Sequence, residues 1–430
     1  MTALSSSREA LSAGSGIVLA LLAIVVFLNF FDRSNLSIAA PLLRDELHLS
    51  ASQLGLLLSS FFWGYTLCQL PAGWIVDRYG ANWVLAAGFF IWSCATFTTG
   101  LLHGFAALLG IRLVLGVGES VAYPSCWSIL ARHFPERRRG FGSAIVQAGQ
   151  ASGPALATFI GGMLMGRFGW QPFFIGLGSA SLLWLVPWMR WMPKGQFTDP
   201  VHMSHTYSGI LAVLRQRSAW GTCVANFCVN WPLYLLLTWL PFYLVQERHF
   251  SLSTTAKIGG AAFLLKASSS IISGWLADTW IAQGASPSLV RKSFVCVGLI
   301  ASSVLFLISA GTPASTPCVV LLLTGSACFG LSSPHGPAII QTLAGQQLAG
   351  TWTGLVLFVA NFAGIMAPAA TGFVVDRSGH FFWAFALAAG FAWVGAAAYL
   401  WIVGPIKQVV WAERSPCLSA HLEDVISERA

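Results

Sequence analysis

The chain has 430 residues, of which 56% are hydrophobic and only 9% are charged. Soluble domains carry about 25% charged residues, so this composition excludes an ordinary soluble protein and indicates one that crosses a lipid bilayer many times. The net charge of +8 does not call for a nucleic-acid partner, because the basic residues gather in the loops between apolar segments. Nine cysteines without a CxxC pair favour neither disulfides nor zinc, and we expect no metal or cofactor.

Twelve apolar segments are long enough to cross a hydrocarbon core of about 30 Å. Backbone polar groups find no water in lipid, so each segment is predicted to be a helix, and the fold class is an all-α membrane protein. The first segment is too long for a signal peptide and is predicted to be a retained helix. The predicted spans are 16–40, 52–76, 83–102, 104–131, 141–166, 170–191, 218–245, 254–277, 293–311, 318–341, 351–375 and 381–404.

The longest polar interruption, residues 192–217, divides the chain into two sets of six helices. We therefore predict an N-terminal half at 1–191, a cytoplasmic linker, and a C-terminal half at 218–430. Short repeats support two pseudo-symmetric halves: GWIVD at 73–77 matches GWLAD at 274–278. Chance similarity between glycine-rich packing segments is the alternative. Duplicated halves place a substrate site near the membrane midplane, between them.

Basic residues predict the orientation. Fifteen of the 23 lysines and arginines fall in one set of alternating loops and tails, and five fall in the other set. The richer side is the cytoplasmic one, so both termini are predicted to be cytoplasmic. Short loops favour a bacterial inner membrane, and we expect a monomer.

Five charged residues lie deep inside predicted spans: Asp32, Arg33, Arg112, Glu119 and Lys266. A charge at the bilayer centre costs about 2.5–3.5 kcal/mol even on the lenient insertion scale, so these side chains must face a cavity or each other. A salt bridge that only holds helices together is the plain alternative. Neighbours such as Asp32 and Arg33 point about 100° apart on a helix, so they are expected to have different partners.

The charges of these five residues indicate the kind of ligand. Three bases and two acids give a net charge of +1, which becomes +2 when Glu119 is protonated. A carboxylate balances that charge and a cation does not, and arginine binds carboxylates through two parallel hydrogen bonds. A glutamate whose arginine partner can switch to the substrate is a natural proton carrier. The sequence therefore predicts a coupled site for a proton and a small organic anion.

Several motifs resemble those of a known superfamily. GWIVDRYGANW at 73–83 and RHFPERRRG at 132–140 are similar to the cytoplasmic loop motifs of the major facilitator superfamily. NFFDRSNLS at 29–37 and LTWLPFYLVQERHFSLS at 237–253 resemble, more narrowly, the anion:cation symporter family and its bacterial sugar-acid/proton symporters. The resemblance implies a secondary active transporter that works by alternating access, and no enzyme.

The resemblance also implies roles for individual residues. Asp32 and Glu119 would couple protons, while Asp77 and Arg78 would form part of an inner gate. The implied substrate-binding residues are Arg33, Arg112, Tyr65, Gln150 and Asn361. The chain departs from the family pattern at Phe30, where a tyrosine is usual, and at Lys266, where an apolar residue is usual.

Lys266 is a further candidate for substrate binding. It could contact a second carboxylate, stay neutral, or pair with Asp32. Its extra positive charge, together with the hydroxyl missing at Phe30, predicts that a dicarboxylate or an aromatic acid is preferred to a monocarboxylic sugar acid. His335 lies beside Ser332, Ser333 and Pro334, which weaken the helix, and it could have a structural or a substrate role.

Two other functions remain open. A proton-coupled exporter of drugs or amphiphiles is supported by Gly140, Gly149, Gly153 and Pro154, which approach the antiporter pattern of the fifth helix. Ala157 and Thr158 stand where the final glycines of that pattern belong, and buried arginines suit a carboxylate better than a lipophilic cation. A ligand sensor without transport is the other alternative, although the predicted tails are short.

Overall fold

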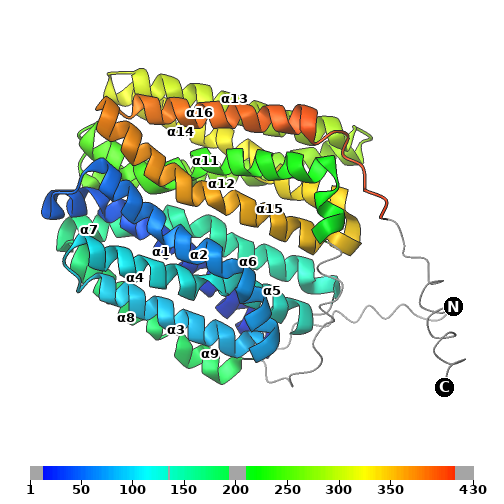
Figure 1. Cartoon of the computed structure of the whole chain (residues 1–430), viewed down its shortest axis with the longest axis horizontal. Coiled ribbons are helices and arrows are strands. Elements are labelled where there is room, and N and C mark those ends of the chain that lie inside the picture. Colours follow the sequence, from blue (N-terminus) through cyan, green and yellow to red (C-terminus); the bar gives the residue numbers. More distant parts are fainter. Residues whose placement is uncertain (1–12, 134–135, 193–209, 412–430) are drawn as a thin grey trace, which may run out of the picture.

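The computed structural model describes residues 13–133, 136–192 and 210–411, and that part is helical, with no strand. Long helices lie side by side along one direction, with the earlier helices (blue to cyan) in one half of the view and the later ones (green to red) in the other (Figure 1). The all-α fold predicted from the sequence is confirmed. The linker predicted at 192–217 lies mostly outside the described residues, so its bounds stay a prediction.

The helices of the N-terminal half follow one another with short connections. They are α1 (Ala13–Leu47), α2 (Ala51–Tyr79), α3 (Ala81–Thr99), α4 (Phe105–Ser120), α5 (Ala122–His133), α6 (Glu136–Leu156), the π-helix η1 (Ala157–Gly161), α7 (Gly162–Phe168), α8 (Trp170–Leu182) and α9 (Leu185–Trp191). The C-terminal half contains α11 (Arg217–Gln246), α12 (Leu252–Ala282), α13 (Pro287–Gly311), α14 (Ser315–Ser332), α15 (His335–Ser378), α16 (Phe382–Ala397) and the π-helix η2 (Ala398–Ile402).

Ten helices of the described part are long and apolar enough to cross a membrane. The other two predicted spans, 52–76 and 141–166, coincide with α2 and with the α6–η1–α7 run. These two spans carry more polar residues. One of them, Gln69 of α2, has a polar partner in the opposite half, because it accepts a hydrogen bond from Asn361.

Breaks in the long helices fall at residues that cannot continue them. Gly345 has a φ of 63°, which separates the last turns of one span from the next span within α15. Such a backbone conformation favours glycine, because a side chain would clash there. α14 ends at Ser332 and α15 begins at His335, on either side of the predicted weak point at Pro334.

The two halves repeat a detail that the short sequence matches do not contain. After the first helix of each half, a histidine adopts a positive φ: His48 at 50° and His249 at 56°. A serine two residues later, Ser50 or Ser251, then accepts a hydrogen bond at the N-terminus of the next helix. Because positive φ is uncommon outside glycine, its recurrence at equivalent positions supports duplication of one structural unit.

Glycines bring the two halves into close contact. A side chain at Gly55 of α2 would meet the backbone at Pro368 of α15, and one at Gly372 would meet Ala51. α12 likewise lies against η1 and α7, where a side chain at Gly162 would meet Ala256. Small residues allow such approach between membrane helices. The charged residues of α1 and α4 lie in the interior of this assembly.

Candidate functional site

An ion pair between α1 and α4 forms the centre of the site. Arg33 Nε donates a hydrogen bond to Glu119 Oε2 over 3.0 Å, and the side chains are 5% and 0% exposed. Two glycines clamp α4 beside the glutamate: a side chain at Gly116 would meet the backbone of Phe61, and one at Gly118 would meet Trp92. The part of α4 that carries Glu119 is therefore packed closely against the backbones of α2 and α3.

Aromatic rings surround the guanidinium of Arg33. Its Cζ atom lies 4.2 Å from the ring centre of Tyr65, 4.7 Å from that of Phe30 and 5.1 Å from that of Phe61. Ring faces attract a cation by their quadrupole, and more strongly when water is excluded. Arg33 Nη2 is buried and has no hydrogen-bond partner. The aromatic contacts hold the cation in place without using all of its donors.

Arg112 and Asp32 complete the charged cluster. Arg112 lies over the Phe61 ring at 5.2 Å, and its Nε has no hydrogen-bond partner. Asp32 accepts a long hydrogen bond of 3.4 Å from Asn35, while its other oxygen is unpartnered. It also interacts electrostatically with Arg112 and Glu119. As expected from the helix geometry, Asp32 and Arg33 have different partners.

Unused polar atoms accumulate at this cluster. Buried polar groups normally find a hydrogen-bond partner, so each exception requires an explanation. Unpartnered atoms occur on Arg33, Arg112, Glu119 and Asp32, and also on Asn29, whose amide nitrogen and oxygen are both free of hydrogen bonds. These donors and acceptors are available to a ligand, a proton or water.

Tyr65 and Asn361 belong to a contact chain that runs from the site into the opposite half. Tyr65 stacks on Phe61, which packs edge-on against Phe62. The chain continues as follows: Phe62 meets the Tyr234 ring of α11 with the centroids 4.6 Å apart, Tyr234 Oη donates to Asn361 Oδ1 over 2.9 Å, and Asn361 Nδ2 donates to Gln69 Oε1 over 2.9 Å. A change at the arginine can therefore reach the packing between the halves.

Gln150 contacts the cluster through α5. Its Oε1 accepts a hydrogen bond from Tyr123 Oη over 2.6 Å, and the Tyr123 ring packs edge-on against Phe30 with centroids 6.2 Å apart. Tyr123 places a hydroxyl near the position where Phe30 lacks one. The Gln150 side chain is exposed and the Tyr123 side chain is half-buried, so this edge of the cluster is accessible.

The remaining predicted residues make no hydrogen bond or ion pair with Arg33 or Glu119 in the described part of the chain. Lys266 of α12 is half-buried, with Nζ 5.7 Å from the Phe329 ring centre, and no ion pair joins it to Asp32. His335 stacks on Phe294 with ring centroids 5.0 Å apart, which favours a structural role. Arg78 is exposed at the end of α2, while the side chain of Asp77 lies outside the described residues.

The structure adds residues that the sequence reasoning missed. Tyr123, Gln69 and Asn29 all contribute polar atoms to this region, and none was predicted as a site residue. Asn29 could have been found, because it lies three residues before Asp32 and therefore close to it on the same helix. The other two gain their roles from pairing with a different helix, which no spacing within one helix reveals.

The side of the molecule where α1 joins α2 is closed by a contact between the halves. Asp376, near the end of α15, accepts hydrogen bonds from Ala51 N over 2.8 Å and Ser52 N over 2.7 Å. These amides open α2 and have no partner inside it, and a carboxylate is favourable at a helix N-terminus. At the corresponding contact between α7 and α12, Gly166 lies beside Leu252. Two carboxylates thus join the halves on this side: Asp376, and Asp45 of α1, whose Oδ1 accepts a hydrogen bond from Gln246 Nε2 of α11 over 3.5 Å.

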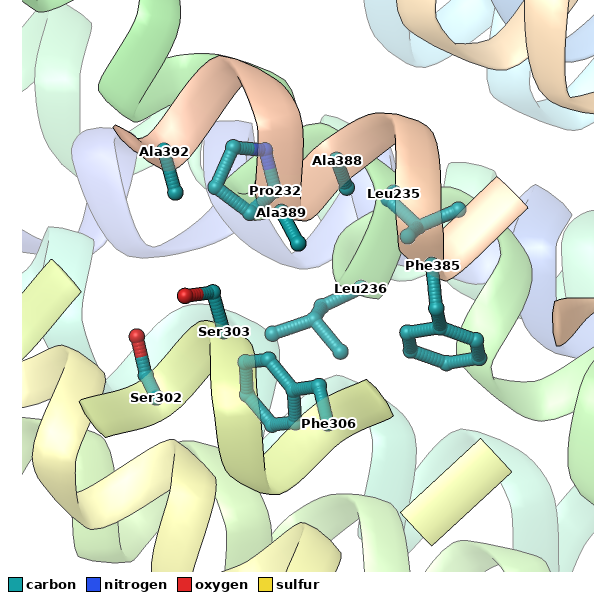
Figure 2. Close-up of a pocket in the computed structure, with 10 residues that line it drawn as sticks. All are labelled: Pro232, Leu235, Leu236, Ser302, Ser303, Phe306, Phe385, Ala388, Ala389 and Ala392. Atoms are coloured by element: carbon teal, nitrogen blue, oxygen red, sulfur yellow. The ribbon is translucent and has the colours of Figure 1, made fainter. Parts of the chain in front are cut away.

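Figure 2 shows a cavity within the C-terminal half that does not suit an organic anion. Its volume is about 10 Å³, and apolar side chains such as Leu236, Phe306 and Phe385 line it. The two hydroxyl residues in its wall, Ser302 and Ser303, donate to carbonyls of their own helix. The cavity has no charged group and at most the room that one water molecule needs. The charged cluster is the better candidate.

Long apolar helices, with a charged cluster buried between α1 and α4, define a polytopic membrane protein. The sequence matches the Major Facilitator Superfamily over residues 22–368. The hexuronate transporter of Bacillus subtilis (strain 168) is 34% identical over 389 residues, which cover 88% of this chain and 92% of the relative. The chain therefore belongs to the Major Facilitator Superfamily, as its motifs predicted.

Two further relatives share most of their length with this chain. The probable galactarate/D-glucarate transporter of Bacillus subtilis (strain 168) is 27% identical, with 91% of this chain and 92% of the relative covered. The D-galactonate transporter of Escherichia coli O6:H1 is 26% identical, with 91% and 96% covered. Both names refer to sugar acids.

Solved structures confirm the predicted fold. A bacterial homolog of the human lysosomal transporter Spinster, in an inward-facing and occupied conformation, gives a TM-score of 0.77 at 18% identity, with 90% of this chain and 96% of that chain covered. The D-xylose–proton symporter gives a TM-score of 0.74 at 14% identity, with 91% and 98% covered. At these identities the likeness concerns the fold alone.

Proposed function

We propose that the protein is a proton-coupled symporter of small organic anions, with sugar acids and related carboxylates as the substrate class. One observation carries the proposal: the buried ion pair of Arg33 with Glu119 lies beside a second buried arginine, Arg112, that has an unpartnered donor. The names of the relatives, which include hexuronate and D-galactonate transporters, support the same substrate class.

The charges of the site give a mechanism. A substrate carboxylate competes with Glu119 for Arg33 and uses the unpartnered donors of Arg33 and Arg112. Glu119 then loses its cationic partner inside an apolar environment, where an unpaired carboxylate is costly and binds a proton instead. Substrate and proton therefore occupy the site together, and losing one favours losing the other. Asp32, which interacts electrostatically with Arg112 and Glu119, is proposed as the second group through which protons couple.

Alternating access follows from the contacts between the halves. In the structure, Asp376 closes the side where α2 begins, while the Gln150 and Tyr123 edge of the cluster is accessible. We propose that substrate binding is transmitted by the contact chain from Tyr65 through Tyr234 to Asn361. In the cell, we place the protein in a bacterial inner membrane as a monomer with both termini in the cytoplasm.

Uptake into proteoliposomes tests this function. Purified full-length protein is supplied in turn with radiolabelled sugar acids, dicarboxylates and aromatic acids, with and without an inward proton gradient. We expect at least one carboxylate to accumulate above its external concentration, and a protonophore to abolish that accumulation. Accumulation of no carboxylate, or proton-driven movement of lipophilic cations instead, would contradict the proposal and favour the exporter.

A further inference from the structure

One face of α12 is directed toward the N-terminal half. Leu252, Gly259 and Lys266 are spaced by seven residues, which returns to nearly the same direction after two turns. The first two of these contact the opposite half: Leu252 lies beside Gly166 of α7, and a side chain at Gly259 would meet Thr158 of η1. Lys266 continues this line of residues by two more turns toward the middle of the molecule.

The opposite face of α12 is the outer one. Leu264, Ile271 and Trp275 are 61%, 73% and 66% exposed, as expected for side chains that face lipid. They lie roughly 140–180° around the helix from Lys266. Lys266 therefore points into the bundle, and its charge does not reach water along the outer surface of the helix.

Lys266 has no counterion among the described residues. Its ammonium group makes no ion pair there, and its Nζ atom lies 5.7 Å from the centre of the Phe329 ring. The helices packed against α12 supply few acids: α6 has Glu136 as its first residue, and the sequence from 137 to 168 and from 315 to 332 contains no aspartate or glutamate. The acid nearest in sequence on α12 itself is Asp278, about 18 Å away along the helix.

A charged lysine that faces the bundle interior without a counterion is stabilised by an anion from elsewhere. With Glu119 protonated, the three bases and Asp32 leave a charge of +2 in the interior of the two halves. A monocarboxylate leaves one positive charge, and a dianion leaves none. Without Lys266, the same site would match a monocarboxylate.

We infer that Lys266 binds the second anionic group of a dianionic substrate, so that the preferred substrate is a dicarboxylate with one end at Arg33 and Arg112 and the other at Lys266. This inference rests on the proposed function and names its substrate class. Lys266 is then the residue that separates dicarboxylic from monocarboxylic sugar acids. The chemistry is the same for any flexible dianion, and a six-carbon sugar diacid is the natural probe.

The test uses two acids that differ at one end only. D-glucarate and D-gluconate share a six-carbon polyol chain and one carboxylate, and the second carboxylate of glucarate is replaced by a hydroxymethyl group in gluconate. Half-saturating concentrations are measured for uptake of each acid into proteoliposomes of the full chain under one fixed proton gradient. The proteins compared are the wild type, Lys266→Leu, Lys266→Arg and the control Lys257→Leu, which removes an exposed lysine from the same helix.

We expect the half-saturating concentration for glucarate to be about tenfold or more below that for gluconate. A hydrogen bond between two charged groups contributes enough binding free energy for such a ratio. Lys266→Leu should remove that preference, because it should raise the half-saturating concentration for glucarate and leave that for gluconate unchanged. Lys266→Arg and Lys257→Leu should keep it. The charge-conserving variant also shows that position 266 tolerates substitution if the leucine variant fails to fold.

The contrary outcomes separate the two proposals. Suppose that the wild type takes up either acid, and that Lys266→Leu changes the half-saturating concentrations for both acids equally or changes neither. The selectivity role of Lys266 is then wrong, while the transport function stands. A wild-type preference for gluconate also overturns the role of Lys266. Uptake of neither acid by the wild type overturns this inference, whereas the proposed function is contradicted only if no carboxylate of the wider uptake screen accumulates.

Discussion

Arg33 and Glu119 are 86 residues apart in the chain and form a buried ion pair of 3.0 Å between α1 and α4. Removing one partner of such a pair leaves the other charge uncompensated, and this commonly costs 3–5 kcal/mol. In the proposed mechanism a substrate carboxylate replaces Glu119 at Arg33, and a proton bound to Glu119 avoids that cost. We therefore expect a substrate carboxylate to separate this ion pair.

Neutralising either arginine should remove substrate binding. Arg33→Ala and Arg112→Ala each delete a charged donor set with free hydrogen-bonding capacity, so affinity for the best carboxylate of the uptake screen should fall by about 100-fold or more. Arg33→Lys should recover only part of the loss, because an ammonium group cannot make the parallel pair of hydrogen bonds. Isothermal titration on detergent-solubilised protein measures this. Unchanged affinity in either alanine variant would make that arginine a structural residue only.

Asp376 should influence which side of the transporter is open. Asp376→Asn weakens two hydrogen bonds to the first amides of α2 and removes a charge from that helix terminus, an effect of about 1 kcal/mol at an exposed position. We expect the population open on that side to rise about fivefold. Distances between spin labels at residues 103 and 380, measured by double electron–electron resonance, report it.

A matched control for this experiment is Glu46→Gln. Glu46 is also an acid at this side, but it accepts hydrogen bonds from Trp170 and Gln171 within its own half. Its replacement should leave the distance distribution between the halves unchanged. Equal broadening in both variants would mean that Asp376 has no specific closing role.

Close backbone packing at Gly116 should matter for stability. Gly116→Ala adds a methyl group against the backbone of Phe61 and Tyr65, so α4 must move away from α2, which typically costs 1–3 kcal/mol. Gly110→Ala on the same helix has open space around it and should be neutral or slightly stabilising. Thermal unfolding of the purified protein compares them: Gly116→Ala should melt several degrees lower, and equal melting temperatures would contradict this packing role.

The charged residues of the site could be predicted from the sequence because charge inside an apolar span is rare whatever the fold. Arg33, Arg112 and Glu119 stand out in this way, and the structure brings them together. Gln150 and Asn361 came only from resemblance to a family, since an amide in a helix carries little signal. Their observed partners, Tyr123 and Gln69, depend on which helices lie side by side.

The closing contact of Asp376 shows the same limit. In the sequence, Asp376 precedes Arg377 and Gly379 at a helix end, where a solvated acid is ordinary. Only the fold places it over the first amides of α2, more than 300 residues away in the chain. Spans and their order follow from hydropathy, whereas contacts between the halves follow from packing that hydropathy does not describe.

Glu119→Gln tests the central claim, that Glu119 exchanges its arginine for a proton when the substrate binds. Glutamine resembles the protonated acid and cannot release a proton. In proteoliposomes, the variant should exchange labelled for unlabelled substrate within about threefold of the wild-type rate, yet show no accumulation under an inward proton gradient. If Glu119→Gln accumulates substrate to the wild-type level in the same vesicles, this claim is wrong.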